Sequence, residues 1–143
     1  MAHGARLALW NPWRTLRNPL VWILHAAYAW IVIHLALRAL AYLGVVPETL
    51  AAHALTIGVI GGMTIGMMTR TARGHSGQPL VAGRAELASY VLVMAAAVVR
   101  VFVGWLAPTW YMESVVASAA LWSAGFAVYA VRYAPMLVRP VIR

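Results

Sequence analysis

The sequence predicts an all-α polytopic membrane protein: a bundle of four transmembrane helices with an N-terminal interfacial segment. Three observations lead to this class. Hydrophobic residues make up 64% of the 143 residues, charged residues make up only 10%, and long apolar runs recur along the chain. A soluble domain has about 25% charged residues, and one of roughly 150 residues buries only about 70% of its surface. The lipid bilayer is therefore the solvent that fits this composition.

The elements follow from the apolar runs, because a helix needs roughly 20 apolar residues to cross a bilayer. Residues 1–19 are expected to be an interfacial arm, since tryptophan and leucine alternate there with arginine. Residues 20–133 form the predicted transmembrane domain, and residues 134–143 a basic tail. The segments that connect the apolar runs contain proline and glycine, which are typical of turns and loops. The four predicted spans are residues 20–43, 50–69, 87–106 and 115–131.

The arginines predict an orientation. Nine of them flank the predicted spans in the arm, the middle loop and the tail, whereas the first and third loops carry glutamate and no arginine. These nine are Arg6, Arg14, Arg17, Arg70, Arg73, Arg84, Arg132, Arg139 and Arg143. The positive-inside rule then puts both termini and the middle loop in the cytoplasm. Trp30 and Trp122 lie deep in their spans and are expected to pack between helices.

Composition also excludes several classes of function. The chain has no cysteine, so disulfides, thiolate metal sites and cysteine nucleophiles are ruled out. No P-loop, GxGxxG or HExxH motif occurs, and three glutamates leave little for acid–base chemistry, so enzymatic activity is left undecided. The net charge of +8 comes from arginines beside apolar runs. It indicates contact with the lipid bilayer rather than with nucleic acid.

Two arginines lie inside predicted spans, where an ionisable group is costly and is a candidate for function. Arg38 shares a helix face with His34, and Arg100 lies at a similar predicted depth in the third span. One interpretation is that each arginine reaches outward and pairs with a loop glutamate, Glu48 or Glu113. The alternative is an anion site, because a guanidinium suits haem propionates or a small nitrogen-oxide anion.

The second span carries two distinct stripes at helical spacing. Its glycines follow GxxxG steps, which let another backbone approach closely. A stripe on the opposite side is polar for a membrane helix and starts at His53. Both faces are therefore expected to be buried in the bundle. The glycines are Gly58, Gly62 and Gly66, and the polar stripe contains His53, Thr56, Ile60, Thr64, Met67 and Thr71.

The remaining histidines are separated along the chain. His25 and His34 are nine residues apart and lie on opposite faces of one helix, so they cannot serve one metal together. For each of them, a hydrogen-bonded packing role is an open alternative to metal binding. His75 lies between glycines in a predicted tight turn, and His3 is expected to be solvated.

The stretch HALTIGVIGGMTIGMMTRTARGHSGQPL, residues 53–80, resembles the signature of the NnrS family. The preceding WILHAAYAWI, residues 22–31, is similar to that family's preceding helix. The resemblance implies a bacterial inner-membrane protein that contains haem b and/or copper, with a link to denitrification and nitric oxide stress. It carries His25, His53 and His75 over as candidate metal-site residues. His34 is not matched to a residue of the family signature, and it remains a candidate metal-site residue because it lies within the first predicted span.

Family members are longer, and the chain is similar to their C-terminal third. Two interpretations follow: the chain is a fragment or a truncated gene product, or it is a short member whose metal site is completed by another membrane subunit that supplies the missing spans. Nitric oxide or a nitrogen oxide is the ligand that the resemblance implies. Two other functions stay open: a transport or channel module with a polar path, and an assembly subunit without a site. The residues of that path would be His34, Arg38, His53 and Arg100.

Overall fold

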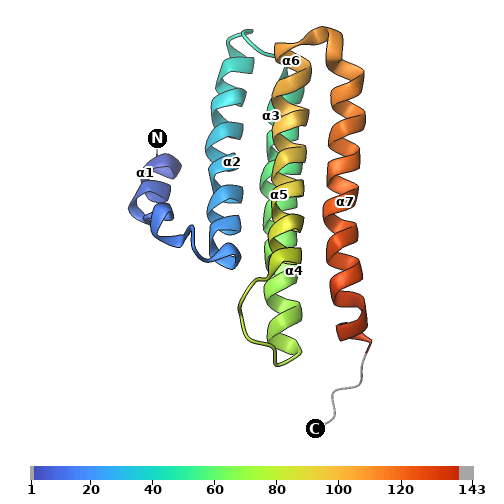
Figure 1. The fold of residues 1–143 in the computed structure, drawn as a ribbon. Helices are drawn as coiled ribbons and strands as arrows, with labels where there is room; N and C mark the ends of the chain where they lie inside the picture. Colours follow the sequence, from blue (N-terminus) through green and yellow to red (C-terminus); the bar gives the residue numbers. More distant parts are fainter. Residues whose placement is uncertain (1, 139–143) are drawn as a thin grey trace.

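The computed structural model describes residues 2–138, and they are helical over most of their length (Figure 1). The all-α prediction is confirmed, since no strand occurs in this range. The short elements are α1 (Ala2–Leu9), η1 (Pro12–Thr15), α6 (Gly104–Leu106) and η4 (Pro108–Trp110). The longer ones are α2 (Pro19–Tyr42), α3 (Glu48–His53), η2 (Ala54–Gly61), α4 (Gly62–His75), α5 (Arg84–Val98), η3 (Val99–Val103) and α7 (Tyr111–Leu137).

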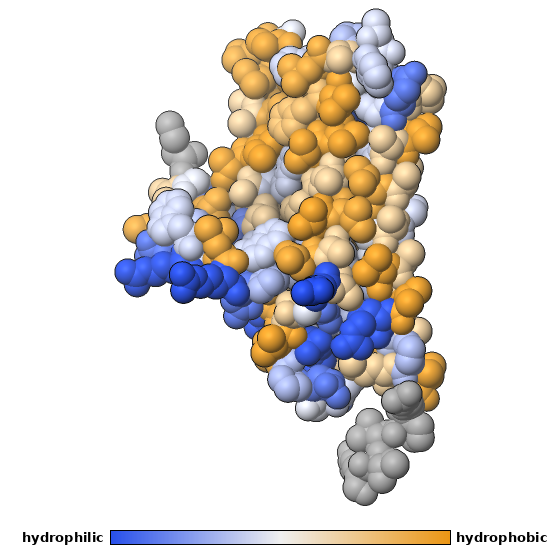
Figure 2. All heavy atoms as spheres, in the orientation of Figure 1, coloured by the Kyte–Doolittle hydropathy of each residue, from blue (hydrophilic) through white to orange (hydrophobic). Residues whose placement is uncertain are grey.

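Several of these elements join end to end, which gives four long helices. They run over Pro19–Tyr42, Glu48–His75, Arg84–Leu106 and Pro108–Leu137, and each is long and apolar enough to cross a membrane. Hydrophobic residues cover most of the face in Figure 2, and hydrophilic residues gather toward its lower end. Burial within the bundle is limited, because each helix also has a face that the other helices leave uncovered. These helices indicate a membrane protein, with four helices that are long and apolar enough to span the bilayer.

The second, third and fourth helices extend beyond the predicted spans, and the third begins at Arg84. The second continues to His75 and ends before the turn at Gly77, whose φ of 64° is in the left-handed region. His75 is thus the last residue of α4 rather than part of a glycine turn. The fourth helix continues to Leu137, so the predicted tail begins within α7. Residues 139–143 of that tail lie outside the described residues.

Small residues let the helices approach one another closely. Gly58 lies against the Trp30 ring of α2, and at Gly62 a Cβ atom would lie 2.8 Å from the Cβ atom of Ala27. Overpacking at such contacts is destabilising. The glycine stripe of the second span therefore packs against α2, as its GxxxG spacing predicts.

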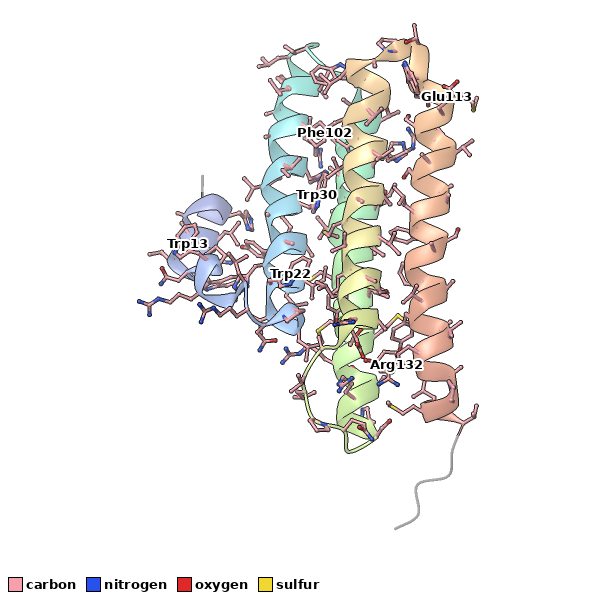
Figure 3. The ribbon with its side chains drawn as sticks, viewed as in Figure 1. Trp13, Trp22, Trp30, Phe102, Glu113 and Arg132 are labelled. Carbon is pink, nitrogen blue, oxygen red and sulfur yellow. The ribbon has the colours of Figure 1, made fainter. Side chains whose placement is uncertain are left out.

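Two tryptophans fill the space between helices, as their depth in the sequence predicts. Trp30 is 5% exposed and stacks on Phe102 with 6.0 Å between ring centroids (Figure 3). Trp122 of α7 lies against Gly61 and packs on Phe126. Large rings thus meet backbone at glycines, which joins α2 and α7 to opposite sides of the second helix.

Hydroxyl groups connect α5 to α7 across the bundle. The Ser89 hydroxyl donates to the Gly125 carbonyl oxygen at 2.6 Å, and the Ser118 hydroxyl donates to the Ala96 carbonyl oxygen at 2.9 Å. All of these groups are buried away from water. Interhelical bonds of this kind stabilise helix pairs in a membrane, where apolar burial alone gives little preference for protein over lipid.

The prediction that the polar stripe is buried is wrong. Only the first residue of the stripe, His53, is partly buried, whereas the others are exposed: Thr56, Ile60, Thr64, Met67 and Thr71. The glycine face packs instead because it allows a closer approach, and each helix of a four-helix bundle keeps one outer face. The Thr56 hydroxyl donates to the Ala52 carbonyl oxygen of its own helix at 3.0 Å. That bond satisfies the hydroxyl without a partner helix.

The N-terminal arm lies against α2 (Figure 1). His3 is not solvated as expected, because its Nδ1 atom is hydrogen-bonded to the Tyr28 hydroxyl at 2.8 Å. Trp10 packs beside the same tyrosine with 5.0 Å between ring centroids. Folding of the arm onto α2 therefore accounts for the partial burial of His3.

Candidate functional site

A pocket of about 200 Å³ opens at the end of the bundle where α2 connects to α3 and α6 connects to α7. We call it the His53–Arg100 pocket. His53, at the end of α3, and Arg100, in η3, supply its ionisable side chains. The complete lining is Pro47, Thr49, Leu50, His53, Arg100, Gly104, Trp105, Pro108 and Tyr111. Two candidate residues that are 47 positions apart in the sequence therefore share one cavity.

Arg100 is held by an aromatic ring rather than by a carboxylate. Its guanidinium carbon lies 5.6 Å from the centre of the Tyr111 ring, within the range of a cation–π interaction. Gly104 lies beside this contact, because a Cβ atom there would be 2.8 Å from the Ser114 hydroxyl and 3.0 Å from the Tyr111 ring. The absence of a side chain at Gly104 thus lets the start of α7 pack close to the pocket.

Both ionisable residues of the pocket adjoin π-helical backbone. His53 directly precedes η2, and Arg100 lies within η3, and both of these segments are π-helical. Short π-helical segments are rare and often occur at functional sites. A π-helical turn also changes the angular position of the residues that follow, so the stripe that starts at His53 cannot be extrapolated through η2 with α-helical spacing.

The expected pairing of the two in-span arginines with loop glutamates is not found. In the part of the chain that the structure describes, both ion pairs use Glu86, and neither uses Glu48 or Glu113. Arg38 is exposed on α2 and does not line the pocket. The two arginines therefore have different surroundings despite their similar depth.

His25 and His34 lie in separate places on α2, as their spacing predicts. The Nδ1 atom of His25 lies 3.3 Å from the Thr15 hydroxyl, and its ring meets the edge of Trp10. The Nδ1 atom of His34 is hydrogen-bonded to the Ala51 carbonyl oxygen at 2.8 Å. Each histidine thus makes the packing contact that the sequence left as an alternative to metal binding.

The candidate metal ligands do not converge within the chain. His75 is exposed at the end of α4, and His53 lies in the pocket at the opposite end of the second helix. Among residues 2–138, no group of three or more histidine, aspartate or glutamate side chains is arranged to hold a metal ion. Of His34, Arg38, His53 and Arg100, only His53 and Arg100 line the pocket.

A buried ionic cluster lies at the other end of the bundle, where the sequence predicted no site; we call it the Glu86 clamp. It consists of Glu86, Arg73 and Tyr133. The Glu86 carboxylate accepts hydrogen bonds from Arg73 Nη1 at 2.9 Å and from the Tyr133 hydroxyl at 2.7 Å. The Glu86 side chain is 2% exposed and that of Arg73 is 10% exposed. Arg132 approaches the same carboxylate at 3.8 Å (Figure 3).

The Glu86 clamp also holds the connection between α4 and α5. The Arg73 Nε atom donates to the Pro79 carbonyl oxygen at 2.8 Å, and the Gly83 backbone N–H donates to Glu86 at 2.9 Å. The spacing of Gly83 and Glu86 matches a helix capping box. This spacing, after a loop rich in arginine, is the sequence feature from which the Glu86 clamp could have been predicted.

The arrangement defines a polytopic helical membrane protein with a small cationic pocket at one end and a neutralised ionic cluster at the other. Comparison with protein families gives a match to the NnrS family, described as NnrS protein, over residues 1–140. The chain therefore belongs to the NnrS family. The comparisons with curated proteins and with solved structures gave no match.

Proposed function

We propose that this protein binds haem and/or copper in the bacterial inner membrane and acts in the response to nitric oxide or nitrosative stress during denitrification. The observation that carries the proposal is the family match over residues 1–140. The histidines at the positions that the family signature implies, His25, His53 and His75, are its candidate ligands. Arg38 and Arg100 are its candidate groups for haem propionates.

The described chain alone does not fit an enclosed cofactor. Copper sites use several converging ligands, and no group of three ligand side chains occurs within residues 2–138. The His53–Arg100 pocket of about 200 Å³ is smaller than the roughly 300–1,000 Å³ that drug-sized ligands occupy, and a haem is larger than most of these. The proposal therefore includes a partner membrane subunit that completes the site.

The proposed orientation has both termini and the α4–α5 loop in the cytoplasm. It is supported by the arginines Arg70, Arg73 and Arg84 around this loop and by the positive-inside rule. The His53–Arg100 pocket would then face the periplasm. A reporter enzyme that works only in the cytoplasm, fused to the C-terminus, is expected to be active, and activity of a periplasmic reporter there would contradict the orientation.

The cofactor is tested by an absorption spectrum and a metal analysis of protein purified in mild detergent. We expect a Soret band or stoichiometric copper, and a loss or spectral shift in His53→Ala. His25 and His53 are near opposite ends of the bundle, so one haem iron cannot bind both. An effect of both His53→Ala and His25→Ala therefore indicates two sites, and an effect of one indicates a single site. Protein without haem or copper would contradict the proposal.

A further inference from the structure

We propose that the His53–Arg100 pocket binds a small, singly charged oxyanion. It concerns two residues that the proposed function assigns to the cofactor, His53 and Arg100, but it needs neither haem nor copper to be bound. The pocket holds about 200 Å³, and a water molecule takes up about 30 Å³ of liquid. An anion of three or four heavy atoms therefore fits with one or two waters, whereas a macrocycle does not.

The lining of the pocket contains no negatively charged residue to balance the positive charge of Arg100. Arg100 brings a permanent positive charge, and none of the nine lining residues is acidic. A buried or half-buried charge without a partner is costly. One negative charge on the ligand would neutralise Arg100, whereas a doubly charged ion would leave an unpaired charge at the edge of an apolar bundle.

The geometry of Arg100 leaves its donors available. Tyr111 lies 5.6 Å from the guanidinium carbon and interacts through the face of its ring. A cation–π contact does not consume the in-plane N–H donors of the guanidinium, which match an oxyanion in a bidentate arrangement. Thr49 and His53 also line the cavity, and both have side chains that can form hydrogen bonds.

The backbone gives a second, independent observation. The two π-helical segments of the described chain both adjoin this pocket, η2 directly after His53 and η3 around Arg100. The packing of α3 against η3 brings the two residues together. Segments with π-helical hydrogen bonding are less favourable than continuous α-helix and are often found at ligand sites. Their coincidence at one pocket favours binding over simple packing.

A free oxyanion and the phosphate diester of a lipid headgroup both carry one negative charge on oxygen atoms that accept hydrogen bonds, so either could be the ligand. The full-length protein is therefore titrated by isothermal titration calorimetry in an uncharged, lipid-free detergent. One titration uses sodium formate, and the other uses a short-chain phosphatidylglycerol at constant ionic strength. Saturable binding of formate supports a free anion as the source, and saturable binding of the phospholipid alone supports a headgroup.

Arg100→Gln is expected to weaken binding by at least about tenfold, since a charged bidentate partner is lost. Arg100→Lys keeps the charge without the fork and is expected to bind with intermediate affinity, which covers the case that Arg100→Gln does not fold. Arg84→Gln removes an exposed arginine at the start of α5, which does not line the pocket, and is expected to bind like the wild type. No saturable binding of either probe, or equal weakening by Arg84→Gln, would overturn the proposal.

Discussion

The two ends of the bundle hold an arginine in different ways: Arg73 is buried and paired, whereas Arg100 is half-buried beside a cavity. In the Glu86 clamp, Arg73 contacts a carboxylate at 2.9 Å and the Pro79 carbonyl oxygen at 2.8 Å, so its charge is paired and two of its nitrogen atoms donate hydrogen bonds within the chain. In the His53–Arg100 pocket, Arg100 contacts only an aromatic face among the interactions of the described residues. A neutralised arginine stabilises the fold, whereas one beside a cavity without a carboxylate is available to a ligand.

The largest expected effect is at the Glu86 clamp. Glu86→Ala leaves the buried charge of Arg73 without its carboxylate, and breaking a buried ion pair typically costs about 3–5 kcal/mol. The free energy of unfolding, measured in mixed detergent micelles, is expected to fall by that amount. Glu113→Ala is the matched control, because Glu113 is exposed and forms no ion pair in the described chain. If both variants had a similar free energy of unfolding, the Glu86 clamp would not stabilise the fold.

A smaller effect is expected at the glycine face between the two ends. Gly62→Leu places a side chain where even a Cβ atom would lie 2.8 Å from Ala27 and 2.7 Å from Met94. Overpacking of this kind costs about 1–3 kcal/mol, which unfolding in mixed micelles detects. Gly74→Ala on the same helix is the control, since no atom lies within 4 Å of its added Cβ. Wild-type stability of Gly62→Leu would show that α2 and α4 are not in contact.

The smallest effect is expected at the arm, where the contact is neutral. His3→Ala removes the hydrogen bond to the Tyr28 hydroxyl, and a neutral bond contributes about 0.5–1.5 kcal/mol. Limited proteolysis is expected to cut the arm faster in this variant than in the wild type. Equal cleavage rates would mean that the position of the arm does not depend on this hydrogen bond. The difference in stabilising effect between the charged contacts of the Glu86 clamp and this neutral contact would then be larger than expected.

Much of the fold follows from local sequence. Apolar runs of about 20 residues predicted the four helices, and glycine spacing predicted the contact at Gly62, because helix formation and close approach depend on nearby residues. The depth of Trp30 and Trp122 predicted that they pack between helices. These features need no knowledge of which helices are neighbours.

The sites depended on information that local sequence does not hold. Arg73 and Glu86 meet only because α4 and α5 are adjacent and the intervening loop folds back, and Tyr133 joins them from a helix 47 residues further on. The polar stripe after His53 is exposed because the glycine face of the same helix packs against α2, and which face is covered depends on the neighbouring helices. Arg100 and His53 were both candidates, but their shared pocket depends on the packing of α3 against η3.

Thermal unfolding in mild detergent, with and without sodium formate, compares the two arginines in one measurement. Arg73→Gln is expected to lower the unfolding midpoint and to keep the stabilisation by formate, since the pocket is intact. Arg100→Gln is expected to unfold near the wild-type temperature and to lose that stabilisation, because a ligand stabilises the folded state only when it binds. Loss of the formate effect in Arg73→Gln, or its retention in Arg100→Gln, would contradict the different roles assigned to the two ends.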